Sequence, residues 1–589
     1  MKDNLSLTWN LENIFRGGSQ SEELTEFIKQ ANALIDKLSE ELHPFSDKQE
    51  KDQLVELTET IKQAQVHTRE IGAFISCLTA QDVTDNNAKL LVSQRNQLSA
   101  RLQKLMTKFG FALSRVDDET WLSWLEDDKL KPIAFVLNEM RDETKEKLPE
   151  EQEQLITDLA IDGYNAWGEM YDTIVGKMTV DWEGEILSVG QLDNKLNSSS
   201  RQERKLAFEK LTAVWNEQSH LFTDTLNHLA GFRLQKYAHR NWDDVLQEPL
   251  AYNRMTKQTL TTMWDTITKN KPAFYQYLAR KADLLNIDKL AWYDLEAPIA
   301  DSMKEVSYQV AAETIVKQFG SFSKRMADFT VNAFEQSWIE AEDRAGKRPG
   351  GFCTSFPRSK ETRIFMTYSG TASNVATLAH ELGHGYHQHV MDDLDPLNQG
   401  YAMNVAETAS TLAEMIVADA AVEQVETNEE KLQLVEDKIQ RSLAFFMNIH
   451  ARFLFETRFY QARKNGFVST EELNQLMEEA QKEAYGDQLA SYHPLFWASK
   501  LHFHITGVPF YNFPYTFGYL FSLGIYAHAK QDKENFADFY DALLRDTGSM
   551  SVESLAKKHL AVDLEKPEFW QSAIDLCIAD VEQFMELTK

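Results

Sequence analysis

Residues that interrupt helices are scarce in this chain. It contains only 24 glycines and 13 prolines among 589 residues, fewer than a protein of short strands and tight turns requires. Apolar residues recur at helical spacing from the start, at Leu24, Phe27, Ile28, Ala31, Leu34, Ile35 and Leu38. Similar amphipathic stretches occur near residues 50–80, 86–114, 203–237, 257–284, 305–336, 430–465, 470–484 and 551–583. The sequence therefore predicts a mainly α-helical protein.

Polar residues suggest where helices and regions begin. Ser19 and Glu22 have the spacing of a capping box ahead of the first long helix. The polar run at residues 197–200 interrupts the helical pattern and is placed to cap a new helix at Arg201. We set a division there, between an N-terminal helical region (1–196) and a longer C-terminal part (197–589). No linker rich in Pro, Gly or Ser separates them, so we expect the two parts to share an interface or cleft.

Strand-like segments are few. One lies near residues 174–190, and another is the pair formed by Phe352–Phe356 and residues 363–368, with a turn at 357–360 between them. If the strand at 363–368 is an exposed edge, an extended peptide can pair with it through backbone hydrogen bonds.

The charge balance excludes several classes of partner. Lys and Arg number 61 against 91 Asp and Glu, a net charge of −30, which disfavours sequence-independent binding to nucleic acid or anionic lipid. The three cysteines are too few and too scattered for a disulfide framework or a Cys-ligated zinc site. No run of about 18 apolar residues could cross a bilayer. We expect a soluble, acidic, cytoplasmic protein without a nucleic-acid or membrane partner.

The segment His380-Glu381-Leu382-Gly383-His384 has the most specific chemistry. Residues four apart lie on one face of a helix, so the two imidazoles can bind one metal ion. Glu381 is adjacent to the first imidazole, where its carboxylate can take a proton from a water beside the metal. Ser373 or Asn374 is placed to cap this helix. The pattern predicts a catalytic metal site rather than two surface histidines.

A catalytic zinc ion needs a third protein ligand and one open position. The pattern with a third histidine requires Gly at position 387 and His at position 390, whereas this chain has His387 and Val390. That pattern is excluded, and the third ligand must come from elsewhere.

A carboxylate downstream fits the third position. Residues 402–417 read as a helix that is apolar on most sides, where a carboxylate is costly to bury unless it is paired or binds metal. Glu407 lies in this helix, far enough after the motif for a turn and an antiparallel return. We expect His380, His384 and Glu407 as ligands. Glu414, two turns later, suits a hydrogen bond from a ligating imidazole.

Residues 504–519 contain Gly507, Pro509, Pro514 and Gly518, which predict a loop. Loops commonly present reactive side chains, and the histidine and tyrosines here can donate hydrogen bonds to an oxyanion. Tyr519 is equally typical of core packing.

With these motifs the chain resembles the oligoendopeptidase F branch of the thimet-oligopeptidase family of zinc metallopeptidases. The resemblance covers nearly the whole chain, through residues 8–15, 290–295, 346–353, 380–384 and 406–410. His504, then Pro509-Phe510-Tyr511 and Tyr515, are similar to the family's substrate-side His and Tyr pattern. Where relatives often read Phe-Tyr-Val-Tyr-x-Tyr, this chain has Phe510-Tyr511-Asn512-Phe513-Pro514-Tyr515. We therefore assign Tyr511 and Tyr515 jointly.

The resemblance implies a two-lobed helical fold with a deep substrate channel and a small β-hairpin or sheet next to the zinc helix. It implies an oligopeptidase F-like N-terminal region at 1–196 and a zinc metallopeptidase domain at 197–589. It also implies one Zn²⁺ per chain, with Glu381, His504, Tyr511 and Tyr515 as catalytic residues. The expected substrates are short peptides, because only an unstructured chain can enter such a channel.

The leading hypothesis is a zinc metalloendopeptidase that cuts internal bonds of oligopeptides, with Glu381 as general base. The alternative is a zinc carboxypeptidase of related architecture, in which Arg201, Arg204 or Arg363 would bind the terminal carboxylate. A non-catalytic peptide-binding protein is disfavoured, because binding alone needs no base beside the metal. The oligomeric state stays open.

Overall fold

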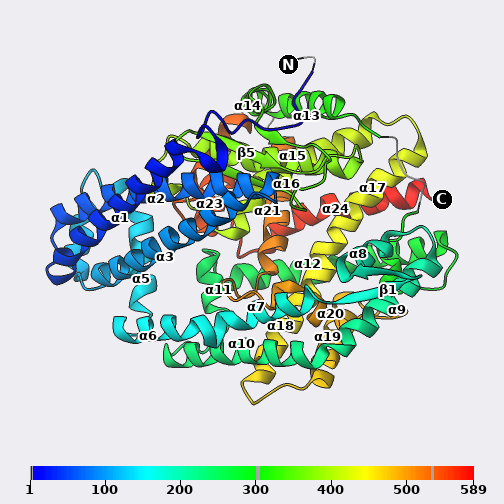
Figure 1. The fold of residues 1–589 in the computed structure, drawn as a ribbon. Coiled ribbons are helices and arrows are strands. Elements are labelled where there is room, and N and C mark those ends of the chain that lie inside the picture. The colour runs from blue at the N-terminus through cyan, green and yellow to red at the C-terminus, as the bar shows by residue number, and fades with distance from the viewer. Residues whose placement is uncertain (1, 3, 300–304, 532–535) are drawn as a thin grey trace.

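The computed structural model describes residues 2, 4–299, 305–531 and 536–589, and it consists mainly of α-helices (Figure 1). The N-terminal helices are α1 (Glu22–Asp47), α2 (Lys51–Gln81), α3 (Asn86–Ser114), α4 (Asp118–Trp124), α5 (Ala134–Lys145), α6 (Glu150–Ala160) and α7 (Ala166–Val175). The middle of the chain forms α8 (Val189–Asp193), α9 (Arg201–Glu217), α10 (Ser219–His239), α11 (Gln247–Tyr252), α12 (Lys257–Leu284), α13 (Tyr308–Phe322) and α14 (Lys324–Glu335). The C-terminal helices are α15 (Ala372–Met391), α16 (Met403–Gln424), α17 (Asn428–Leu443), α18 (Ile449–Arg463), α19 (Thr470–Ala484), α20 (Phe496–Ser499), α21 (Phe513–Gln531), α22 (Phe536–Asp546), α23 (Val552–Leu560) and α24 (Pro567–Leu587). The predicted helical class is confirmed.

Several of the predicted helical stretches are divided. Residues 203–237 form α9 and α10, and residues 305–336 form α13 and α14, with the Ser323 side chain capping α14. A π-helix, Ala444–Asn448, joins α17 to α18. Pro567 begins α24. Proline fits there because the N–H groups of the first helical turn have no partner within the helix, so the N–H that proline lacks is not needed. Apolar periodicity continues across these breaks and therefore does not locate them.

Two helix caps differ from the prediction. Ser21 rather than Ser19 caps α1, and its side chain accepts a hydrogen bond from the Leu24 N–H. Thr371 caps α15 and forms a capping box with Asn374, so this helix begins slightly earlier than predicted.

Among the described helices, none combines the length and the apolar character needed to cross a membrane.

Two small sheets complete the described fold. β1 (Thr179–Trp182) and β2 (Glu185–Ser188) form an antiparallel hairpin. In the second sheet, β5 (Glu361–Phe365) lies between β3 (Ile339–Glu340), which is parallel to it, and β4 (Phe352–Phe356), which is antiparallel. The predicted hairpin at 352–368 is confirmed. Its second strand is central rather than exposed, so the expectation of an edge at 363–368 was wrong, because β3 covers that side. β4 is the edge.

Buried apolar side chains gather in two clusters. One is built from residues 9–137, in α1 to α5, together with Phe356, Phe365 and Leu397. The other extends from Tyr171 to Phe584 and contains the apolar residues of α15 and α16. The sheet therefore joins the layer of α1, α2 and α3 to the body of the molecule (Figure 1). The division after residue 196 stays a prediction.

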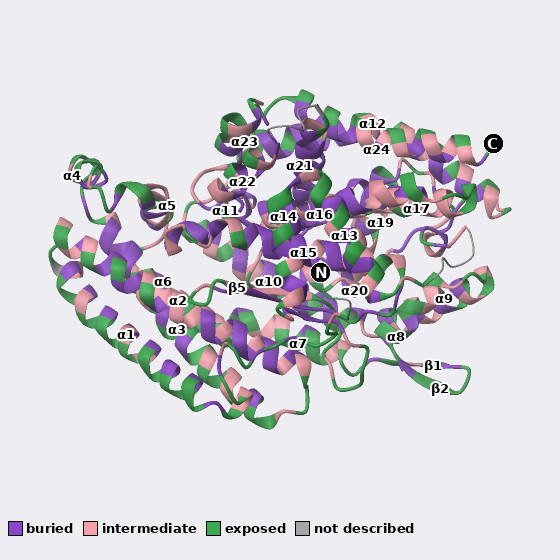
Figure 2. Ribbon diagram, turned by 90° about the horizontal axis from the view of Figure 1, so that it is seen from above, coloured by how far each residue is buried: buried purple, intermediate pink, exposed green. Residues whose placement is uncertain are grey.

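Helix α16 packs between α15 and α21 at the buried centre of the molecule (Figure 2). Gly383 of α15 lies against α16 so closely that a Cβ there would be 2.5 Å from the Ala409 carbonyl oxygen. On the other side of α16, a Cβ on Gly518 of α21 would lie 2.9 Å from the Asn404 carbonyl oxygen and 3.1 Å from the Glu407 Cβ. These two glycines set the spacing of three helices that carry most of the predicted site residues.

Candidate metal centre and active site

Three side chains of α15 and α16 converge on one point. His380 and His384 lie one turn apart on α15, with their Nε2 atoms 3.1 Å from each other. Oε2 of Glu407 lies 3.3 Å from His380 Nε2 and 3.6 Å from His384 Nε2. A tetrahedral zinc ion with bonds of about 2.0–2.1 Å holds its ligand atoms roughly 3.3 Å apart. The spacing of the three donors, all on separate side chains, therefore fits one zinc ion.

The ring of His380 is fixed from its other side. Its Nδ1 lies 2.6 Å from Oε1 of Glu414, and Arg441 pairs with Oε2 of the same carboxylate. A proton held on Nδ1 by Glu414 leaves Nε2 free to bind a metal. Glu414 thus lies where the sequence predicted it. Although burial opposes ionisation, hydrogen bonding from His380 and the charges of both imidazoles lower the pKa of Glu407 to about 2.

Glu381 is buried beside these ligands but is not directed at the same point. Only 7% of it is exposed, and its Oε2 has no hydrogen-bond partner among the described residues. Burial, helped by the charges of Glu407 and Glu414, raises the pKa of this carboxyl to about 7. A Cβ on Gly351, just before β4, would lie 3.4 Å from Glu381 Oε1. The carboxylate thus lies between the metal ligands and the edge strand, where proton transfer to or from a substrate is feasible.

Tyr511 and Tyr515 lie together near the metal ligands, with ring centroids 5.7 Å apart. Burial raises the pKa of Tyr515, and the Tyr511 ring and the Glu407 charge add to the effect, so its phenol stays a donor. Tyr515 is three residues before Gly518, so both lie on the face of α21 that turns towards Glu407. The loop prediction was wrong for residues 513–519, because Pro514 occupies the first turn of a helix, where its missing N–H costs nothing.

The structure places His504 elsewhere. Its ring is fully buried, stacks on Tyr171 at 4.0 Å, and its Nε2 lies 3.3 Å from the Trp497 carbonyl oxygen. It therefore packs between Tyr171 of α7 and the Trp497 backbone and does not join Tyr511 and Tyr515.

His502 occupies the position beside the tyrosines. Its ring centroid lies 5.4 Å from that of Tyr511 and 6.1 Å from that of Tyr515. Burial, with the nearby charges of Arg452 and Lys500, lowers the pKa of His502 to about 4, so its ring is neutral at pH 7. The local pattern His-Phe-His offers two candidates, and in the structure His502 faces the tyrosines while His504 stacks on Tyr171.

The segment that carries Tyr511 is held in place by a buried carboxylate. Glu456, 4% exposed, accepts hydrogen bonds from the Phe510 N–H (3.2 Å) and from Nδ2 of Asn512 (3.0 Å). Phe510 has φ 52°, a left-handed conformation that is strained for an aromatic residue. The two hydrogen bonds offset this strain and hold the Phe510 backbone and the Asn512 side chain, on the two sides of Tyr511.

The arginines that a carboxypeptidase would need are bound within the fold. Arg201 and Arg204 both pair with the buried Asp294. Arg363 is fully buried and pairs with Glu361. None of the three is free to bind a terminal carboxylate, which removes the support for that alternative.

Gly383→Ala is expected to weaken zinc binding at least tenfold and to lower Tm. The added methyl would overlap the Ala409 carbonyl and push α16, with Glu407, away from the two histidines. Zinc titration and thermal unfolding measure the two effects. Gly320→Ala is the matched control, because its new Cβ makes an ordinary contact of 3.6 Å with Ala327. Equal zinc affinity in the two variants would contradict the role given to Gly383.

Comparisons with known proteins agree with this geometry. The sequence model described as Peptidase family M3 matches residues 195–576, and one described as Oligopeptidase F matches residues 112–179. An oligoendopeptidase F homolog of Lactococcus lactis subsp. lactis is 23% identical over 98% of this chain and 97% of its own length. Oligopeptidase PepF of Bacillus subtilis is 22% identical over 81% of this chain and 72% of its own.

Solved structures share the fold. A protein of Chlamydophila abortus superimposes with a TM-score of 0.83 at 19% identity, covering 99% of this chain and 98% of that one. Oligoendopeptidase-F from Enterococcus faecium gives a TM-score of 0.67 at 18% identity, covering 96% of this chain and 97% of that one. At these identities the likeness establishes the architecture.

Proposed function

Because this chain belongs to peptidase family M3, we propose that it is a zinc-dependent metalloendopeptidase that hydrolyses internal bonds of short peptides. The observation that carries the proposal is the convergence of His380, His384 and Glu407 next to a buried glutamate that is not among them. The oligoendopeptidase F relatives, which match the chain along nearly its full length, support endopeptidase activity on oligopeptides. We assign one Zn²⁺ to each chain.

The residues around the metal have separate roles in hydrolysis. Zinc, when bound by His380, His384 and Glu407, supplies a Lewis acid that polarises the scissile carbonyl and lowers the pKa of water. Glu381 takes the proton of the attacking water and returns it to the leaving amine. Glu414 keeps the proton of His380 on Nδ1.

Hydrogen-bond donors opposite the zinc ligands stabilise the oxyanion. Tyr515, supported by Tyr511, donates from its phenol as negative charge develops on the carbonyl oxygen. We add His502 to this group in place of His504, because its ring lies against both tyrosines. We assign His504 a structural role, because its ring stacks on Tyr171 of α7.

The edge strand β4 accounts for recognition of unstructured peptides. An extended substrate can add to β4 through backbone hydrogen bonds, whatever its side chains. The start of β4 lies next to Glu381, so a peptide bound there passes the catalytic carboxylate. This mode of binding suits extended segments, and short peptides are the substrates that we propose. A location in the cytoplasm stays a prediction.

The decisive test is a product map of a mixed peptide library, analysed by mass spectrometry with and without a chelator. We expect internal cuts that the chelator abolishes and added Zn²⁺ restores. Stepwise loss of C-terminal residues would instead indicate a carboxypeptidase, and cleavage that survives metal removal would contradict the proposal.

Tyr515→Phe is expected to lower kcat by about 10²–10³-fold with little change in KM, the cost typical of losing one oxyanion donor. Tyr519→Phe, the same substitution one turn later on α21, is the control, because its hydroxyl is buried against Ser442. Steady-state kinetics on one quenched-fluorophore peptide compare the two. An unchanged kcat for Tyr515→Phe would exclude it as the main donor.

A further inference from the structure

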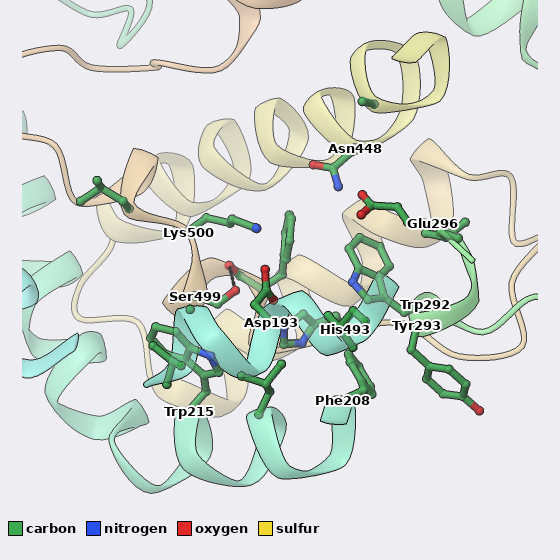
Figure 3. A pocket seen from close by; sticks show the side chains of 18 of the residues that line it. Asp193, Phe208, Trp215, Trp292, Tyr293, Glu296, Asn448, His493, Ser499 and Lys500 are labelled. Atoms are coloured by element: carbon green, nitrogen blue, oxygen red, sulfur yellow. Dashed lines mark hydrogen bonds between the residues drawn. The ribbon is translucent and has the colours of Figure 1, made fainter. Parts of the chain in front are cut away.

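A cavity of about 380 Å³ lies outside the metal centre and is lined by residues of both the N-terminal region and the C-terminal part of the chain. Aromatic residues form much of its wall, among them Trp215 and Trp292 (Figure 3) and also Phe496. Leu501 also lines it, and the next residue, His502, stands beside Tyr511 and Tyr515. The cavity therefore adjoins the substrate side of the proposed site.

Two cations lie against the ring of Phe496, which lines the cavity: Lys500, itself a lining residue, and Arg452, which lies behind the lining residues Phe496 and Asn448. Lys500 Nζ lies 5.0 Å from the ring centroid of Phe496, and Arg452 Cζ lies 5.2 Å from it. Figure 3 shows the Lys500 side chain reaching into the cavity, on the same side as the amide of Asn448. That amide oxygen accepts a hydrogen bond from Arg452 Nε at 2.8 Å.

Neither cation forms an ion pair with an acidic side chain in the described part of the chain. Among the described residues Arg452 donates a hydrogen bond to Asn448 alone, which leaves most of its N–H donors unused. Burial lowers the pKa of Arg452 to about 10, as expected where no carboxylate compensates it. By contrast, the buried Arg204 is paired with Asp294. A half-buried guanidinium without a counter-ion is costly unless a ligand supplies one.

The acidic groups of the cavity do not fill this role. Asp193 and Glu296 face the same space (Figure 3), and their charges act on Lys500 from a distance, yet both are exposed to solvent and neither forms an ion pair with Lys500 in the described part of the chain. Because they are exposed, these carboxylates impose no need for a ligand. Charge complementarity at the wall near His502 therefore favours an anion.

We propose that Arg452 and Lys500 bind the free α-carboxylate of the peptide substrate, while the aromatic wall accepts the side chain of its last residue. This rests on the proposed function, which brings a peptide past Tyr515. A guanidinium fork matches a carboxylate in two parallel hydrogen bonds, and Lys500 adds a second charge. The anchor selects short peptides by the distance between the scissile bond and the free C-terminus, and cleavage stays internal.

Pairs of identical peptides ending in a free acid or in an amide test the anchor. The zinc-loaded wild type should cleave the acid with a kcat/KM at least tenfold higher, through a lower KM. Arg452→Gln and Lys500→Gln should each bring the ratio of acid to amide close to one by raising KM for the acid alone. Arg458→Gln, on the same helix and paired with Glu483, removes an equal charge and should keep the ratio.

Several outcomes would overturn the inference. A wild-type ratio of one, or a ratio that Arg452→Gln and Lys500→Gln both leave unchanged, would contradict the anchor. An equal fall of kcat for acid and amide in Arg452→Gln would instead show that this arginine supports Tyr515. A wild type loaded with zinc that cleaves neither peptide would refute the proposed function itself, and the anchor with it.

Discussion

Glu381→Gln is expected to lower kcat for a quenched-fluorophore peptide by roughly 10²–10⁴-fold, the range typical of losing a general base. Glutamine keeps the size of the side chain but has no basic oxygen to accept the proton of the attacking water. Zinc content should stay at the wild-type level, because Glu381 lies outside the converging set of His380, His384 and Glu407. Kinetics and metal analysis on the same preparation measure both quantities.

The control for this substitution is Glu423→Gln, an exposed change of the same kind on α16, which should leave both quantities unchanged. Undiminished hydrolysis by Glu381→Gln would remove the proposed base. Loss of zinc from that variant would show that Glu381 is a ligand, and the division of roles between the two glutamates would then be reversed.

Local sequence rules predicted that the proposed metal ligands converge, because each rule has a direct geometric consequence. A spacing of four residues on one helix forces His380 and His384 to the same face, and their Nε2 atoms lie 3.1 Å apart. An apolar helix that nevertheless contains a carboxylate signals a partner for that carboxylate. Glu407 and Glu414 both follow this rule, and both contact the His380 ring.

The substrate side was harder to predict, because it depends on the relative position of elements far apart in the chain. The choice between His502 and His504 is made by Tyr171 of α7, which stacks on one of them. No local pattern contains that information. Likewise, Arg452 is one of many cations in the sequence, and only the fold places it against Phe496 and Asn448 at the cavity, with no acidic partner among the described residues.

The prediction that residues 363–368 form an exposed edge strand was wrong for a similar reason. The two residues of β3 are too few to give an alternating pattern, yet they pair with β5 and make it the central strand. The edge therefore passes to β4, which begins next to Gly351 and Glu381. The prediction of a strand that can receive a peptide persists, with a different strand in that position.

Glu407→Gln is expected to weaken zinc binding by more than about 100-fold and to abolish hydrolysis at limiting zinc. A neutral amide replaces a carboxylate whose oxygen lies within 3.6 Å of both imidazoles. Two imidazoles alone leave a four-coordinate zinc without its third protein ligand. Competition with a zinc-sensitive dye gives the affinity, and circular dichroism shows whether the helices persist.

Glu414→Gln, on the same helix, gives the comparison that decides between a ligand and its support. Glu414 touches the metal centre only through His380 Nδ1, and removing such a hydrogen-bond partner typically costs 10–100-fold in metal affinity. The order wild type, Glu414→Gln, Glu407→Gln in falling affinity therefore follows from the positions of the two carboxylates. If Glu407→Gln bound zinc as tightly as Glu414→Gln, another group would have to complete the coordination, and the assignment of Glu407 as the third ligand would be withdrawn.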